Sequence, residues 1–352
     1  MPGKIAYCTG FWCTNVGNAF FSLGVEYVLK QIVGEKNVTI VSDYQTYTTG
    51  YGKRLFPDKN QLEYLTKLEV DFIVLAGPVI SKYFLKLWKD ILIALEKRGI
   101  RYMILSAGMM KMTEDSLAEC QLFFRDHPPY VLCSRDRKTY DIFGKYADHA
   151  YDGVCFSFFA PEYYAPSGIH EKYLTLNFDK ISEPKIWADE NNSDDSFEFD
   201  GRAFHVKHTG LLSNVARKTD SFTDALIYVT SFFPQAKRDD RIGDYTVYRT
   251  DHRFHPHFRK KIFGRPNSFC ADLPYGYLNL YANSALTLSD RVHSCAVTMA
   301  YGHSAMLFSV TNRVGLLERV GAGDISERPA ALDMERLKVE KQRMVDWLRT
   351  VI

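Results

Sequence analysis

Short apolar runs alternate with a helical repeat through the first half of the chain. Phe20, Val25, Val28 and Leu29 recur at helical spacing, and a second helix is expected at residues 84–97. The strand-length runs are residues 4–9, 38–41, 71–76, 102–106, 130–134 and 153–156. Most of these runs are apolar at nearly every position, which is typical of a parallel sheet buried on both faces. The pattern therefore predicts an α/β domain with helices packed on both sides of its sheet.

The second half repeats the alternation after a linker at residues 159–169, which contains two prolines. Strands are expected at residues 173–177, 225–230, 245–248, 285–289 and 305–309. Residues 188–195 are acidic and rich in asparagine, and we expect an exposed loop there. Residues 333–351 form a charged amphipathic helix with Leu337, Met344, Val345 and Leu348 on one face. We predict two doubly wound, Rossmann-like domains facing a central cleft, at residues 1–165 and 166–330, followed by a C-terminal helix at 331–352.

Composition excludes several classes of function. The 352 residues include 44 basic and 42 acidic side chains, a balance that does not suit a protein that coats nucleic acid. Neither a signal peptide nor a membrane-spanning run is visible, so a cytoplasmic protein is expected. The seven cysteines form no Cys-x-x-Cys pair, which is typical of reduced, buried thiols.

The strongest candidate site is the Arg291-Val292-His293 turn. It follows the apolar run at 285–289 and precedes a helix of small and apolar residues, so it joins a strand's carboxyl end to a helix's amino end. Free N–H groups and the helix dipole favour anions there, and an arginine adds a forked donor. Arg291, His293 and the next residue, Ser294, are therefore predicted to bind an anionic donor. The alternative is a structural salt bridge at Arg291 and a helix-start role for His293.

Two further turns also follow apolar runs. Arg135, within Ser134-Arg135-Asp136, either faces a ligand or solvates a helix surface, and solvation is expected for its neighbours Arg137 and Lys138. After the first strand, Gly17 permits a tight turn, and Asn15 and Asn18 offer hydrogen bonds to a hydroxylated ligand. This turn lacks the glycine pattern of a dinucleotide site, so no nicotinamide cofactor is predicted.

A histidine-rich segment, residues 251–257, precedes three basic residues at 259–261. Its spacing matches none of the common zinc patterns, and Pro256 interrupts any helical face. We interpret the segment as a solvated basic loop, with contact to an anionic ligand or to lipid headgroups as the alternative. No metal and no cofactor is predicted.

Together, Asn15-Val16-Gly17-Asn18, Ser134-Arg135-Asp136 and Asp290-Arg291-Val292-His293, followed by Asn312-Arg313-Val314-Gly315, resemble the polysaccharide pyruvyl transferase family. The resemblance spans most of the chain. It implies a GT-B-like architecture and transfer of enolpyruvate from phosphoenolpyruvate onto a sugar as a ketal. It also implies that Arg291 and His293 hold the donor, while the turn with Asn15, Gly17 and Asn18 is assigned to the acceptor, a sugar or lipid-linked oligosaccharide.

The sequence departs from this family at two places. Asn18 stands where the family usually has aspartate, which removes a candidate base. Leu176-Asn177-Phe178-Asp179 stands where the family tends to have an arginine, so a second donor-binding arginine must come from elsewhere, with Arg135 and Arg313 as the candidates.

His293 is the candidate acid, since only histidine titrates unaided near neutral pH. The base is left open between Asp290 and Asp136. Two alternatives remain: a GT-B-like glycosyltransferase that uses a nucleotide sugar, and a carbohydrate-binding protein without catalysis. Peripheral association with the inner face of a membrane is a further expectation, and it depends on a lipid-linked acceptor.

Overall fold

Two separate parallel sheets organise the chain. The computed structural model describes residues 3–10, 15–42, 61–179, 181–188, 195–207, 239–252, 267–309 and 314–352. Contacts divide these residues into two compact units. The first unit takes in the described residues of 1–12, 18–159 and 335–352, and the second takes in those of 13–17 and 160–334. The units thus exchange short segments of chain, because residues 15–17 belong to the second unit and the C-terminal helix belongs to the first.

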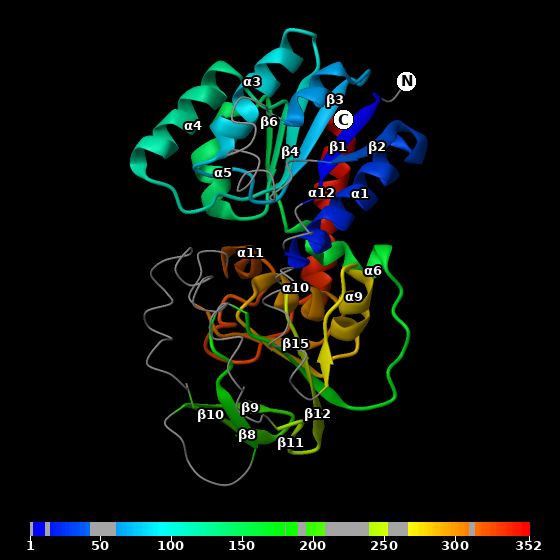
Figure 1. Ribbon diagram of the computed structural model, residues 1–352, viewed down its shortest axis with the longest axis vertical. Helices are drawn as coiled ribbons and strands as arrows, with labels where there is room; N and C mark the ends of the chain where they lie inside the picture. The colour runs from blue at the N-terminus through cyan, green and yellow to red at the C-terminus, as the bar shows by residue number, and fades with distance from the viewer. Residues whose placement is uncertain are drawn as a thin grey trace. The chain divides into compact units, whose positions relative to one another are not determined.

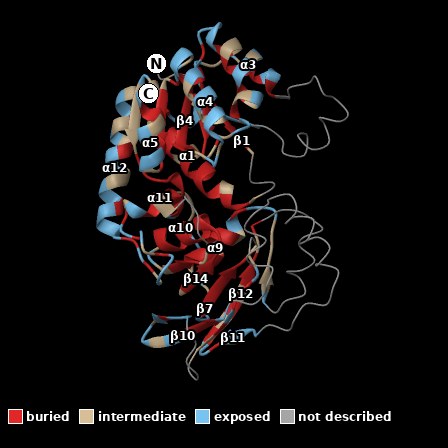
Figure 2. Cartoon of the chain, turned by 90° about the vertical axis from the view of Figure 1, so that its left-hand side faces the viewer, coloured by how far each residue is buried: buried red, intermediate tan, exposed pale blue. Residues whose placement is uncertain are grey.

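A six-stranded parallel sheet forms the first unit, with the strand order β2-β1-β3-β4-β5-β6 (Figure 1). The strands are β1 (Ile5–Thr9), β2 (Val38–Ser42), β3 (Phe72–Ala76), β4 (Arg101–Ala107), β5 (Val131–Ser134) and β6 (His149–Asp152). The helices are α1 (Gly17–Val33), α3 (Phe84–Glu96), α4 (Glu114–Asp126), α5 (Arg137–Phe143) and α12 (Met334–Val351), with 3-10 turns at Glu35–Asn37, Gln61–Lys67, Gly144–Tyr146 and Phe156–Phe159. Every residue of β1, β3 and β5 is buried, as the apolar runs predict. β4 of the same sheet is drawn mostly in the red of buried residues in Figure 2.

Helices cover both faces of this sheet. α3, α4 and α5 place Trp88, Phe124 and Phe143 in one core cluster with alternate strand residues such as Ile73. On the other face the Tyr7 hydroxyl donates to the Ser22 carbonyl of α1 at 3.0 Å. The C-terminal helix α12 belongs to this unit, because Tyr130 donates to the Val351 carbonyl at 2.8 Å and Trp347 stacks on Tyr151 with ring centroids 4.9 Å apart. The doubly wound arrangement predicted for this unit is confirmed.

The second unit has a mixed sheet. Its path is β11-β12-β7-β14-β15, with β13 beside the end of β12. The strands are β7 (Tyr173–Asn177), β11 (Arg241–Ile242), β12 (Tyr245–Thr250), β13 (Ser268–Phe269), β14 (Leu286–Ser289) and β15 (Ser304–Leu307). The helices are α6 (Ala160–Tyr163), α9 (Tyr275–Ala282), α10 (Val292–Ala300) and α11 (Gly315–Glu318). β12, β7, β14 and β15 run parallel, so their carboxyl ends meet at one edge.

A smaller antiparallel sheet, which the sequence did not lead us to expect, packs on one face of this mixed sheet. Its order is β8-β10-β9, from β8 (Lys185–Ala188), β9 (Asp195–Phe199) and β10 (Arg202–Lys207). Ile186, Phe197 and Phe204 form one core cluster with Leu176 and Leu288 of the larger sheet. α10 lies on the opposite face, where Thr298 and Thr287 share a hydrogen bond of 2.7 Å between their hydroxyls.

One predicted strand is wrong. The last strand of the first sheet is β6 at His149–Asp152, whereas the sequence predicted residues 153–156. Those apolar residues are buried, but they lead into the 3-10 turn Phe156–Phe159 instead of pairing with β5. The strand expected at 225–230 lies outside the described residues, as do residues 189–194 of the predicted acidic loop.

Candidate functional site

The Arg291 turn lies where β14 ends and α10 begins. β14 is buried along its length between β7 and β15, and Arg291 is the N-cap residue of α10 in an extended conformation, with φ −117° and ψ 117°. Its side chain does not cap the helix. The predicted junction of a strand end with a helix start is therefore confirmed.

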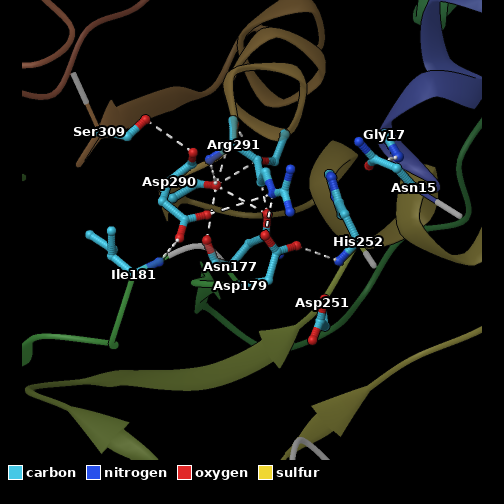
Figure 3. A network of polar contacts seen from close by, with 12 residues as sticks. Asn15, Gly17, Asn177, Asp179, Ile181, Asp251, His252, Asp290, Arg291 and Ser309 are labelled. Carbon is cyan, nitrogen blue, oxygen red and sulfur yellow. Dashed lines mark hydrogen bonds and ion pairs between the residues drawn. The ribbon is translucent and has the colours of Figure 1, made fainter. Parts of the chain in front are cut away.

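The Arg291 side chain is buried among carboxylates, being 7% exposed. Its Nε bonds to Asp179 Oδ1 and lies 3.9 Å from Asp290 Oδ1 (Figure 3). Burial acts against the charge, but Asp179, Asp290 and Asp251 outweigh it and raise the pKa of Arg291 above its ordinary value. The guanidinium is therefore permanently charged. Its Nη2 is buried and has no hydrogen-bond partner among the residues that the structure describes.

A network of buried hydroxyl groups holds the backbone of the Arg291 turn in place. The Ser289 hydroxyl donates to the Asn177 carbonyl at 3.1 Å and accepts from the Arg291 N–H at 2.8 Å. The Ser294 hydroxyl lies 2.7 Å from that of Ser289 and donates to the Arg291 carbonyl at 2.6 Å. Ser294 was predicted to bind the donor, and this must be corrected for its side chain, which is fully buried and holds the turn.

The carboxylate of Asp290 is also anchored within the second unit. Its Oδ2 accepts from the Ile181 N–H at 2.8 Å, and its carbonyl accepts from the Ser309 hydroxyl at 3.0 Å (Figure 3). Asp290 is fully buried. It therefore supports the Arg291 turn, and it is not the accessible carboxylate expected of a general base.

His252 connects Asp179 to the first predicted turn. Its N–H donates to Asp179 Oδ2 at 3.0 Å, its Nε2 lies 2.6 Å from the Tyr281 hydroxyl, and its carbonyl accepts from the Val16 N–H at 2.8 Å. A Cβ on Gly17 would lie 2.7 Å from His252 Nδ1, so only glycine fits against this ring. The turn at Asn15–Gly17 and the Arg291 turn, far apart in the sequence, thus meet in one network within the second unit (Figure 3).

The burial of His252 corrects the interpretation of residues 251–257 as a solvated loop. His252 is 1% exposed, and residues 253–257 lie outside the described part of the chain.

His293, the candidate acid, is buried in the first turn of α10 at 4% exposure. In the turn that was predicted to bind the acceptor, the Asn15 side chain accepts from the Gly17 N–H at 3.2 Å, and Asn18 is a half-buried residue of α1 in the first unit.

Arg135 stands at the corresponding strand end of the first unit. It follows β5, is 3% exposed, and its guanidinium lies 5.9 Å from the centroid of the Phe21 ring. The carboxylate of Asp136 accepts from the Thr139 N–H at 2.8 Å and caps α5, which argues against a role as base. Arg137 is exposed and pairs with Asp141 at 2.8 Å, which agrees with the solvated role expected for it. Arg313 lies outside the described residues.

No group of three or more histidine, cysteine, aspartate or glutamate side chains is arranged to hold a metal ion in the described part of the chain. Over the same residues, no helix has both the length and the apolar character needed to cross a membrane.

Comparison with solved structures defines the class of fold. S. aureus MnaA, in a co-structure with UDP, is 14% identical over 97% of this chain and 88% of that chain, with a TM-score of 0.51. The UDP-GlcNAc 2-epimerase of Methanocaldococcus jannaschii, in complex with UDP-GlcNAc and UDP, is 12% identical over 97% and 93%, with a TM-score of 0.50. These similarities show a GT-B-like fold of two Rossmann-like domains.

The family follows from the sequence itself. The model of the polysaccharide pyruvyl transferase family matches residues 15–312, which include every motif discussed above except Val314-Gly315 and Arg313. The chain belongs to this family and is a transferase, for which the family implies a polysaccharide or sugar acceptor. No curated protein matched the sequence.

Proposed function

We propose that the protein transfers the enolpyruvyl group of phosphoenolpyruvate to a sugar of a cell-surface polysaccharide, or of its lipid-linked precursor, and forms a pyruvate ketal. The observation that carries the donor assignment is Nη2 of buried Arg291 at the amino end of α10, which has no hydrogen-bond partner among the described residues. A buried guanidinium N–H without an acceptor costs free energy unless a ligand satisfies it. A carboxylate or phosphate oxygen is the acceptor that suits it best.

Charge limits what Arg291 can do alone. Asp179 and Asp290 already offset its positive charge, while phosphoenolpyruvate carries close to three negative charges. The N–H groups of the first turn of α10 supply part of the remaining attraction, because the amino end of a helix favours anions. A second cation is still needed, and Arg135 and Arg313 remain the proposed sources.

In the proposed reaction a proton is delivered to the methylene carbon of phosphoenolpyruvate, which leaves a cation at the central carbon. One sugar hydroxyl attacks this carbon and loses its proton. A second hydroxyl of the same sugar then displaces inorganic phosphate, and the ring closes to the ketal. We assign the proton delivery to His293, which shares the first helical turn with the donor-binding N–H groups.

Binding and product mass test the donor. Phosphoenolpyruvate should raise the thermal midpoint of the protein, and UDP- and GDP-sugars should not, because only a ligand of the native state stabilises it. Incubation with phosphoenolpyruvate and a panel of oligosaccharide acceptors should give a product heavier by one pyruvate ketal. A midpoint that responds to a nucleotide sugar, with a product heavier by one glycosyl unit, would overturn the proposal in favour of glycosyl transfer.

Arg291→Lys sharpens this test, with Arg137→Ala as the control. Lysine keeps the charge but loses the fork, so donor affinity should fall about tenfold or more. Arg137 is exposed and paired on its own helix, so its removal should leave donor affinity unchanged. Equal losses in the two variants would place the donor elsewhere.

We also propose that catalysis needs no metal and takes place in the cytoplasm, at the inner face of the membrane where the acceptor is lipid-linked. Turnover should survive exhaustive treatment with a chelator. Loss of turnover that returns with Mg²⁺ or Mn²⁺ would contradict the first part. Recovery of the protein with the membrane fraction only when lipid-linked acceptor is present would support the second.

A further inference from the structure

A second buried arginine lies on the other face of the same sheet. Arg249 belongs to β12 and pairs with Leu176 of β7, while the following residues, Thr250 and Asn177, pair with each other. Successive side chains of a strand point to opposite faces. Asn177 contacts the hydroxyl network under Arg291, so Leu176 and Arg249 face the small antiparallel sheet instead.

A cavity of about 320 Å³ opens at Arg249, between the two sheets of the second unit. Its apolar wall includes Leu176, Ile186 and Ile242. This volume falls at the lower end of the range for small-molecule sites, roughly 300–1,000 Å³. The cavity also lies at the carboxyl ends of parallel strands, where ligands of α/β proteins bind.

Arg249 bonds to two partners, and one of its guanidinium nitrogens has no hydrogen-bond partner among the described residues. It is 3% exposed; its Nε donates to both oxygens of Glu183 at 3.1 and 3.2 Å, and its Nη2 donates to the Asp239 carbonyl at 2.7 Å. Its Nη1 is buried without a hydrogen-bond partner among the described residues. Arg249 lines the cavity, so a guanidinium that is fixed in this way and has one N–H group without an acceptor is a preorganised donor for a ligand oxygen.

The charges that line the cavity indicate whether the ligand that supplies this oxygen is anionic or neutral. Buried Glu183 balances Arg249, and the two exposed residues of opposite charge that also line the cavity, Lys185 and Asp239, balance each other. A phosphate or carboxylate would meet two carboxylates here without a net positive charge to hold it. A neutral hydroxylated ligand has acceptor oxygens for Arg249, hydroxyl donors for Glu183 and C–H faces for the apolar wall.

We infer that this cavity binds a neutral sugar unit of the acceptor, with Arg249 Nη1 and Glu183 as its polar contacts. The inference rests on the proposed function, since it takes the ligand to be part of the saccharide acceptor. The loop between β7 and β8 connects the two sites: Asp179 bonds to Arg291, and Glu183 bonds to Arg249 four residues later. One short segment thus holds both buried arginines.

The test uses the full-length protein and a panel of methyl hexopyranosides, with affinity measured by saturation-transfer NMR. The double variant Arg249→Met/Glu183→Leu removes both polar contacts but leaves no unpaired buried charge, so it should fold. Affinity for the bound glycoside should fall at least about tenfold, the scale of a lost hydrogen bond to a charged group. Arg202→Met, which removes a half-buried arginine of β10 paired with Asp244, should bind the glycoside like the wild type.

A second variant keeps the test decisive if the double variant does not fold. Ile242→Phe narrows the cavity without changing its charges, and it should weaken glycoside binding by a similar factor. Absence of glycoside binding to the wild type, unchanged affinity in both variants, or displacement of the glycoside by inorganic phosphate would overturn the inference. The thermal shift with phosphoenolpyruvate should persist in every variant. If the glycoside binds but phosphoenolpyruvate gives no shift in the wild type, the proposed donor fails and the sugar site stands.

Discussion

Arg291 and Arg135 occupy equivalent places, at the carboxyl end of a parallel strand in the second and the first unit, but their surroundings differ. Arg291 is bonded to Asp179 and lies beside Asp290. Arg135 packs over the Phe21 ring and against Gly108, where a Cβ would lie 2.6 Å from its Nε. Asp179 and Asp290 surround the first arginine with charge, whereas Phe21 and Gly108 pack closely against the second. The two should therefore respond to different kinds of substitution.

The largest effect is expected from Asp179→Asn. This change leaves the buried Arg291 charge without its main partner, and breaking such a buried pair costs about 3–5 kcal/mol of unfolding free energy. Chemical denaturation monitored by circular dichroism measures the loss. Asp141→Asn is the control, because its partner Arg137 is exposed, and no measurable change is expected there. Similar losses in both variants would contradict an electrostatic role for the Asp179 pair.

His293→Asn tests whether proton delivery takes place at the Arg291 turn. Phosphoenolpyruvate should bind nearly as well as to the wild type, while turnover falls about a hundredfold or more, the scale of losing a general acid. His149→Asn, a half-exposed histidine of β6 in the first unit, should leave both unchanged. If binding and turnover fall in the same proportion in His293→Asn, the residue positions the donor and the acid lies elsewhere.

Gly108→Ala tests the close packing at Arg135. The added methyl group must displace the Arg135 side chain, so we expect a loss of about 1–3 kcal/mol, as for other overpacked sites. Gly168→Ala adds the same methyl group where no atom lies within 4 Å, and its stability should not fall. Thermal unfolding of the two variants side by side measures the difference. Equal midpoints would mean that Arg135 moves aside without cost.

The smallest effect concerns the buried thiol of Cys120 on α4. Burial, with a smaller contribution from Glu119, raises the pKa of Cys120 from 9.0 to about 11. A raised pKa means that the thiol stabilises the fold fully below pH 9, and that this contribution is lost as the pH rises towards 11. Unfolding free energy should decline across that window, and less so in Cys120→Ala. At pH 8, iodoacetamide should modify the half-exposed Cys270 before Cys120, as followed by mass spectrometry.

The continuous apolar runs were sufficient to predict most of both parallel sheets, because a strand buried on two faces has no polar positions. The same rule explains the one misplaced strand. β6 is an edge strand of half-buried residues, His149–Asp152, so it lacks an apolar run. The apolar residues 153–156 are buried for another reason: Phe156 packs so closely on α1 that a Cβ on Gly24 would lie 2.0 Å from its carbonyl oxygen.

The small antiparallel sheet had a signal that our interpretation did not use. Asp200-Gly201 separates two alternating segments, and both residues have positive φ, of 53° and 72°. This is the two-residue hairpin turn for which Asp-Gly is a strong local indicator. The sheet forms one wall of the cavity at Arg249, through Lys185 and Ile186 of β8.

The Arg291 turn was predictable because strand, turn and helix are consecutive in the sequence. The partners of this turn were not predictable, because Asp179 and His252 follow β7 and β12, which are far from β14 in the sequence. The strand order of the sheet places β7 beside β14 and β12 beside β7. No local pattern distinguishes a buried histidine from a solvated one in the segment 251–257. A rule that examined the second residue after each parallel strand would have included both Asp179 and His252.

The exchange of segments between the units has a consequence for how the protein is made. Residues 15–17 are synthesised long before their partner His252, which lies about halfway through the second unit. In the same way β5 and β6 await the helix Met334–Val351, which follows the entire second unit in the sequence. Neither unit is therefore a contiguous stretch of chain that can finish folding during translation. Expression of residues 18–159 or 160–334 alone would leave each with an uncovered face, so the two units are expected to complete their folding together, once the helix Met334–Val351 has been synthesised.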